Sequence, residues 1–177
     1  VAHGGFAGLK RALGMSGAEI VDEVLESGLR GRGGAAFPTG IKWEGAAKAA
    51  GQPKYIVCNA DESEPGTFKD RILMEEDPHR TIEGMIIAAH AVGARHGYIY
   101  VRGEYPYAFK VMGAALDEAR QDGLLGASIL GSALEFDIEM RLGALHKVLL
   151  ESGTHPTQQI ALISQLDGDA AGMAEVA

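Results

Sequence analysis

The sequence predicts an α/β fold in which a parallel sheet is flanked by helices. Over residues 55–140, short apolar runs alternate with segments of helical periodicity, in the order strand, helix, strand, helix, strand. This order is typical of right-handed crossovers between neighbouring parallel strands. The chain has 177 residues, of which 46% are hydrophobic, and this is enough for a compact domain with a real core.

Helical patterns precede this alternation. Residues 5–15 predict a short amphipathic helix, and a second helix follows in which Ser16 and Glu19 stand in capping-box spacing and Gly28 can form the end. Residues 28–40 are too glycine-rich for a helix or a central strand. Thr39 or Gly40 could cap a third helix that runs through Trp43 and the following alanines.

The alternating region predicts three strands and two helices. Residues 55–58 form a short apolar run that suits a buried strand, and residues 98–101 form another. Helices are expected from Pro78 to Gly93 and from Pro106 to near Gly123. Residues 134–140 alternate strictly between apolar and polar side chains and predict the third strand.

The predicted organisation has three parts. Residues 1–51 hold the N-terminal helices and the glycine-rich loop, residues 52–144 hold the parallel sheet, and residues 145–177 form a tail without a recognisable motif. Within this tail, residues 148–150 and 160–166 could be helical. A shifted reading frame, a gene-model error or a fused fragment would each explain the divergent tail.

Composition excludes several functions. The net charge of −8 argues against a nucleic-acid partner, because phosphate contacts need a basic face. No apolar run approaches the roughly 20 residues that cross a bilayer, so we expect no direct membrane insertion. Cys58 is the only cysteine and cannot hold an iron–sulfur cluster, which normally takes four. We expect it to be a buried thiol.

The glycine-rich loop has the features of an anion or cofactor site. Glycines leave its backbone uncovered by side chains, and basic residues bring positive charge close to a helix start. The glycines are Gly31, Gly33 and Gly34, and the basic residues are Arg30, Arg32 and Lys42. A helix rather than a strand precedes the loop, so it is not a standard dinucleotide fingerprint. A structural turn without a ligand is the alternative.

An acidic turn follows the first strand of the alternating region. Asp61, Glu62 and Glu64 place three carboxylates within four residues, and Asn59 lies two residues before the first of them. Such a turn is often only solvated surface, and a metal site lacks support from nearby histidines. Carboxylates and an amide can also bind the hydroxyls of a nucleotide. Ligands of parallel sheets lie beyond the carboxyl ends of the strands. We therefore expect the acidic turn and the glycine loop to meet in one cleft at this edge.

Two long segments carry a family resemblance. GLRGRGGAAFPTGIKW (28–43) and YIVCNADESEPGTFKDR (55–71) resemble the FMN-site motifs of the NADH-binding flavoprotein subunit of respiratory complex I. They also resemble the diaphorase subunits of NAD-reducing hydrogenases and formate dehydrogenases. The resemblance covers about residues 5–144 and implies a Rossmann-like parallel sheet. The family usually has glycine where this chain has Ala36, and the Gly-Glu-Glu-Thr turn expected after residue 144 is missing from the sequence.

The resemblance implies two sets of site residues. The FMN set joins the glycine loop to the acidic turn and consists of Gly31, Arg32, Gly33, Lys42, Asn59, Asp61 and Glu62. The NADH set consists of Phe37, which would stack on the nucleotide, and Glu64. Some relatives have a second aromatic residue where this chain has Gly45.

The implied activity is FMN-dependent oxidation of NADH, with electrons passed on to iron–sulfur clusters. The cofactors are FMN and NAD, and the resemblance implies no general acid or base; the ligands of the family's 4Fe-4S cluster are absent from this chain. The implied partners are a thioredoxin-like 2Fe-2S subunit and an iron–sulfur subunit, in a complex on the cytoplasmic face of the membrane. The alternatives are a nucleotide-binding fragment without catalysis, or a diaphorase subunit of a hydrogenase or formate dehydrogenase.

Overall fold

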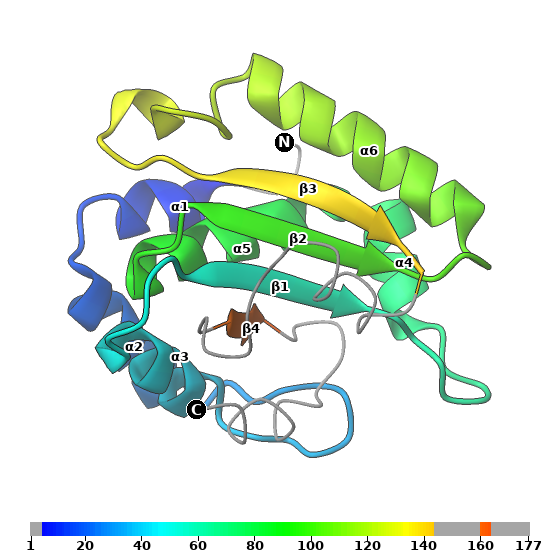
Figure 1. Cartoon of the computed structure of the whole chain (residues 1–177), viewed down its shortest axis with the longest axis horizontal. Coiled ribbons are helices and arrows are strands. Elements are labelled where there is room, and N and C mark those ends of the chain that lie inside the picture. The colour runs from blue at the N-terminus through cyan, green and yellow to red at the C-terminus, as the bar shows by residue number, and fades with distance from the viewer. Residues whose placement is uncertain (1–4, 144–159, 164–177) are drawn as a thin grey trace.

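A sheet of four parallel strands organises the computed structural model, which describes residues 5–143 and 160–163 (Figure 1). The strand order is β3-β2-β1-β4, so the strand that follows the others in the chain returns beside β1. The strands are β1 (Tyr55–Ala60), β2 (His96–Val101), β3 (Asp137–Leu142) and β4 (Ile160–Ile163). The predicted parallel sheet is confirmed.

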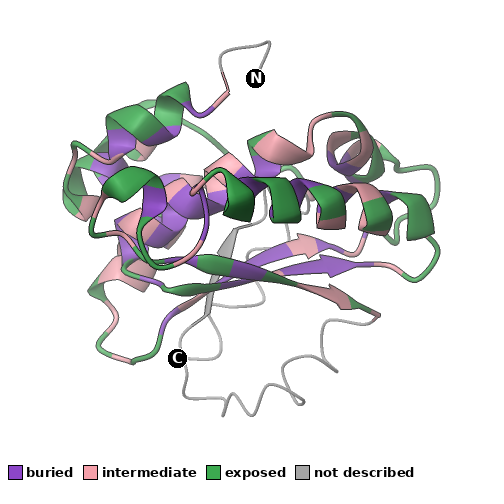
Figure 2. Ribbon diagram, turned by 90° about the horizontal axis from the view of Figure 1, so that it is seen from above, coloured by how far each residue is buried: buried purple, intermediate pink, exposed green. Residues whose placement is uncertain are grey.

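The helices gather on one side of the sheet (Figure 2). Their apolar faces pack with the inner face of the sheet into one core, in which α5 lies against β1 and β2. None of the helices in the described part of the chain has the length and hydropathy of a bilayer span. The helices are α1 (Ala7–Ala12), α2 (Gly17–Glu26), α3 (Thr39–Lys48), α4 (Lys69–Glu76), α5 (Pro78–Val92) and α6 (Pro106–Gln121), with a 3₁₀ turn at Ile129–Gly131.

Helix ends follow the sequence signals at α2 and α5. The Ser16 hydroxyl accepts a hydrogen bond from the Glu19 N–H at 3.3 Å, and the Glu19 carboxylate accepts from the Ser16 N–H at 2.7 Å. The predicted capping box is therefore present. Helix α5 begins at Pro78 and is capped after Val92 by Gly93, whose φ of 77° is easy only for glycine.

The structure differs from the predictions at several elements. Helix α4 was not expected, and the N-cap of α3 is Pro38 rather than Thr39 or Gly40. Strand β3 begins at Asp137, because Phe136 instead pairs with Gly126 in an antiparallel bridge. Residues 160–163 form β4 rather than a helix, because they pair with β1. The helix expected at 148–150 lies outside the described residues.

Cys58 lies on the inner face of β1 and is 1% exposed. Burial raises the pKa of its thiol, and the nearby Asp70 carboxylate raises that pKa further. Both causes disfavour the thiolate, which is the nucleophilic form. The expected buried thiol is confirmed.

We therefore predict that Cys58 in the folded chain does not react with a disulfide reagent at pH 8. Reaction should become complete only when the chain is unfolded in urea, as measured by the absorbance of the thiol that the reagent releases. Ser63→Cys, on an exposed turn, is the matched control and should add one rapidly reacting thiol. Fast labelling of Cys58 in the folded wild type would contradict the buried position.

Close packing of α3 on α2 depends on Gly40. A Cβ at this buried position would lie 2.6 Å from the Leu25 Cγ and 2.8 Å from the Leu25 backbone nitrogen. Gly45 lies on the same helix, but a Cβ there would meet nothing within 4 Å. A side chain at position 40 would therefore clash with α2, whereas one at position 45 of the same helix would not.

Gly40→Ala should lower the free energy of unfolding by about 1–3 kcal/mol, because α3 must move away from α2. Gly45→Ala should raise it by up to about 1 kcal/mol, because alanine favours the helix. Urea unfolding of both variants tests this pair. Equal effects at the two positions would show that the α2–α3 contact is looser than described.

Candidate functional site

The acidic turn leaves the carboxyl end of β1, as the sequence predicts. In the parallel register Ala60 lies opposite Val101, so the residues that follow β1 and β2 emerge at the same edge of the sheet. The Asn59 side-chain oxygen accepts a hydrogen bond from the Asp61 N–H at 3.1 Å. This local bond turns the chain sharply out of the strand.

Glu62 points into the protein rather than into solvent. Its side chain is 2% exposed, and its two carboxylate oxygens accept from the N–H groups of Asp70 at 3.3 Å and Arg71 at 3.4 Å. These N–H groups belong to the first turn of α4, where carboxylates are stabilising. The Tyr105 hydroxyl lies 3.5 Å from the same carboxylate. Glu62 therefore caps α4 in this structure.

Arg102 was not singled out from the sequence, yet it holds the acidic turn. It is the first residue after β2, and its guanidinium Nη1 donates to the Glu62 carbonyl oxygen at 2.7 Å. Its Nε lies 3.4 Å from Asp61 Oδ1, and its Nη2 donates to Glu104 at 3.1 Å. The signal that could have identified it is its register position beside Asp61 on a parallel sheet.

The outer part of the turn remains open to solvent. Thr67 donates to the Glu64 carbonyl oxygen through both its N–H, at 3.1 Å, and its hydroxyl, at 2.8 Å. Gly66 takes the left-handed conformation that the bend requires, with φ of 86°. The Glu64 residue is exposed. Its carboxylate is thus placed at the surface of the turn.

The glycine loop has fixed ends and an exposed middle. Its ends are joined by bonds from Gly31 N–H to the Phe37 carbonyl and from Thr39 N–H to the Leu29 carbonyl, both at 2.9 Å. Gly34, near the tip, has φ of 104°, and a Cβ there would meet nothing within 4 Å. The backbone of the loop is therefore accessible to a flat or anionic ligand.

Ala36 occupies a backbone conformation that suits glycine. Its φ is 50°, which costs an L-residue roughly 1–2 kcal/mol. The Arg30 guanidinium donates to its carbonyl oxygen at 3.1 Å and helps to hold the loop in this shape. The conformation gives a physical reason for the glycine that the related family usually has here. Phe37, the next residue, is 36% exposed and presents its ring at the surface.

Helix α3 begins directly after the loop. Its N-cap is Pro38, which provides no side-chain hydrogen bond to the first turn. The N-terminal end of a helix carries a partial positive charge that favours anions. Lys42, on the second turn, is half-buried and adds a cationic side chain at this end of the helix.

The two segments are linked through β4. Helix α3 packs beside β4, and β4 pairs with β1, from which the acidic turn leaves (Figure 1). In the figure the glycine loop lies beyond the β4 edge of the sheet, whereas the turn extends from the carboxyl end of β1. The expected common cleft stays a prediction.

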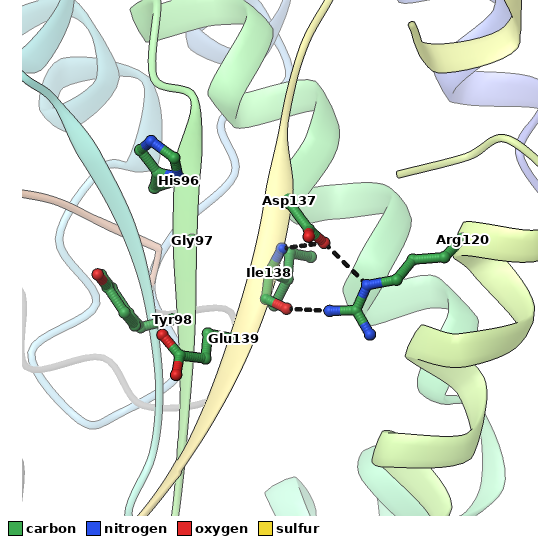
Figure 3. A pocket seen from close by; sticks show the side chains of 7 residues that line it. All are labelled: His96, Gly97, Tyr98, Arg120, Asp137, Ile138 and Glu139. Carbon is green, nitrogen blue, oxygen red and sulfur yellow. Dashed lines mark hydrogen bonds and ion pairs between the residues drawn. The ribbon is translucent and has the colours of Figure 1, made fainter. Parts of the chain in front are cut away.

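A cavity of about 230 Å³ lies at another part of the sheet (Figure 3). It is bordered by the amino-terminal halves of β2 and β3, and its lining mixes charges of both signs. The lining residues are His96, Gly97, Tyr98, Arg120, Asp137, Ile138 and Glu139. None of these is a predicted site residue, so the cavity is separate from the acidic turn and the glycine loop.

Arg120 shapes the outer border of this cavity. Its Nη2 donates to the Ile138 carbonyl oxygen at 2.6 Å, and its Nε donates to Asp137 at 3.1 Å (Figure 3). The Asp137 carboxylate in turn accepts from the Ile138 N–H at 2.8 Å. Side chains therefore satisfy both backbone groups of Ile138 on strand β3, which lies at the edge of the sheet.

Comparisons with known proteins identify the relatives of this chain. It is 56% identical over 144 residues to an NADH-quinone oxidoreductase subunit of Rhizobium meliloti, covering 81% of this chain and 34% of that protein. It is 52% identical to the NADP-reducing hydrogenase subunit HndC of Solidesulfovibrio fructosivorans, covering 81% of this chain and 29% of that one. The chain thus spans about a third of the length of these curated relatives.

A solved structure is similar as well. A chain of an NAD⁺-reducing [NiFe]-hydrogenase in its air-oxidised state aligns with a TM-score of 0.66 and 32% identity, covering 91% of this chain and 30% of that one. This neighbour supports the Rossmann-like fold. The family described as the Nuo51 FMN-binding domain matches residues 24–170, which includes most of the segment after residue 144. The likeness therefore extends further along the chain than the motifs alone indicated, and the chain belongs to the Nuo51 FMN-binding domain family.

Proposed function

We propose that this chain is the FMN-binding part of a longer flavoprotein subunit that oxidises NADH. Two segments support the proposal. One is the glycine loop, whose ends are joined by backbone hydrogen bonds and which leads into α3, and the other is the acidic turn at the carboxyl end of β1. Membership of the FMN-binding family supports it. The relatives named as subunits of NADH-quinone oxidoreductase support the choice of NADH.

The chemistry of these residues fits FMN. The backbone of Gly31, Gly33 and Gly34 allows a ring to approach closely, while Arg32, Lys42 and the start of α3 favour a phosphate. Asn59 and Asp61 provide an amide and a carboxylate for ribityl hydroxyls. Glu62 belongs to the same predicted set. Because its carboxylate caps α4, we propose that it acts mainly by holding the turn in place.

The exposed side chains next to these segments suit NADH. Phe37 offers an aromatic ring at the surface, and stacking of this kind is worth about 0.5–1.5 kcal/mol. Glu64 offers a carboxylate that can accept hydrogen bonds from ribose hydroxyls or a carboxamide. Gly45 provides no second ring. Bound FMN would supply the redox chemistry, as an acceptor of hydride and a donor of single electrons, and the protein would supply binding and orientation.

The complete subunit would belong to a larger assembly. The names of the relatives describe them as subunits of quinone reductases and hydrogenases. We propose that the partners are a thioredoxin-like 2Fe-2S subunit and an iron–sulfur subunit, and that the complex is peripheral to the cytoplasmic face of the membrane. A diaphorase subunit of a hydrogenase is the second candidate, supported by the 52% identity to subunit HndC.

Purified chain reconstituted with FMN should retain a yellow flavin absorbance after gel filtration, and NADH should bleach that absorbance without oxygen. We expect weaker retention than in a full-length relative, because this chain spans about a third of such proteins. An anaerobic spectral titration with NADH measures both properties. No retained flavin would reject the proposed cofactor site, and retained flavin without bleaching would favour a binding fragment.

Glu64→Gln should weaken NADH-dependent reduction more than FMN binding. Loss of hydrogen bonds to a charged group is worth about 1.5–3 kcal/mol, so the NADH concentration at half-maximal reduction should rise roughly tenfold or more. Glu76→Gln, at the exposed end of α4, is the control and should behave as the wild type. A larger loss of FMN affinity than of NADH affinity would reverse the assignment of Glu64.

A further inference from the structure

We propose that Arg102 is a positioning residue for the cofactor site. It holds the start of the acidic turn, and so orients Asp61 and the main chain of Glu62 for the ligand. This inference rests on the proposed function. It concerns a residue that directly follows β2, outside both motifs that carry the predicted FMN and NADH contacts.

The Arg102 guanidinium contacts three groups: the Glu62 carbonyl, the Asp61 carboxylate and the Glu104 carboxylate. Nη1 donates to the Glu62 carbonyl oxygen at 2.7 Å, Nε lies 3.4 Å from Asp61 Oδ1, and Nη2 donates to Glu104 at 3.1 Å. The bond to the carbonyl oxygen is short and charge-assisted, and such bonds are stronger than neutral ones. One guanidinium therefore binds both the main chain and a side chain of the turn.

Arg102 complements the cap at α4. The Glu62 carboxylate is held by the N–H groups of α4, while the Glu62 carbonyl is held from the neighbouring strand by Arg102. Glu62 is therefore fixed at both ends. The outer turn, by contrast, is closed by local bonds between Thr67 and Glu64. Arg102 provides a link from the beginning of the turn to the rigid sheet.

The geometry requires arginine rather than any cation. The guanidinium is planar and presents donors in several fixed directions, whereas a lysine ammonium is a compact charge on a flexible stem. The side chains of Arg102 and Asp61 are 28% and 30% exposed, so solvent screens this ion pair in part. A partly exposed ion pair adds little stability, so we expect this pair to act mainly by orienting the Asp61 side chain.

Hydrogen–deuterium exchange of the ligand-free chain tests the first half of the proposal. In Arg102→Gln and Arg102→Lys, the bonded amides of Asp61, Asp70 and Arg71 should exchange about tenfold faster than in the wild type, with α5 unchanged, because their bonds depend on the position of the start of the turn. Glu104→Gln is the matched control, because it removes the negative charge of the exposed partner of Arg102 and leaves the contacts of Arg102 to the turn. Unchanged exchange in both Arg102 variants would overturn the proposal, whether or not FMN binds.

Affinity for FMN tests the second half. Both Arg102 variants should raise the FMN Kd about tenfold, a change of about 1.4 kcal/mol, while Glu104→Gln keeps the wild-type Kd. Urea unfolding of each variant separates a local effect from general destabilisation. A wild-type Kd in Arg102→Lys would show that charge alone suffices and would overturn the positioning role. Absence of FMN binding by the wild type would instead reject the proposed function, and the exchange data would still decide whether Arg102 holds the turn.

Discussion

Parallel pairing of β1 with β2 places the acidic turn and Arg102 at one edge of the sheet. Because Ala60 lies opposite Val101, the acidic turn and Arg102 leave neighbouring strands side by side. A shift of one residue would exchange the two faces of β1 and move Cys58 out of the core. It would also separate Asp61 from the guanidinium that faces it. The apolar packing of β1 on α5 therefore also determines the position of Asp61 and Arg102.

The three carboxylates of the acidic turn have different roles, although they are close in sequence. Glu62 is buried and caps a helix, Asp61 faces Arg102, and Glu64 lies in solvent. A ligand can therefore meet the exposed carboxylate without displacing the one that holds the turn. The glycine loop divides its tasks in a similar way, since backbone bonds fix its ends and leave its tip uncovered. In both segments, the groups that fix the backbone differ from those that are open to solvent.

Much of the fold could be predicted because its signals are local. Pro78 and Gly93 mark the two ends of α5, and the capping box of Ser16 and Glu19 marks the start of α2. Helix α4 was missed because its sequence is polar and its cap, Glu62, lies outside the helix. The apolar run at 160–163 suits a helix or a strand equally, and only its pairing with β1 decides between them.

The candidate site was predictable to a similar extent. Its residue types and its place after a strand were visible in the sequence, but the direction of each side chain was not. The inward orientation of Glu62 depends on α4, and the contacts of Arg102 depend on the pairing of two strands. Ala36 is a further example. Its positive φ follows from the bonds that close the loop, and composition alone carries no sign of it.

The side chains around Ile138 have a consequence for assembly. An edge strand with free N–H and carbonyl groups can recruit a strand from another molecule. On β3, Asp137 and Arg120 already occupy both groups of Ile138, so an incoming strand would have to break an ion pair before it could align. Addition of a strand at Ile138 is thus obstructed. A protein that docks here would have to recognise Arg120 and Asp137 through side-chain contacts instead of backbone pairing.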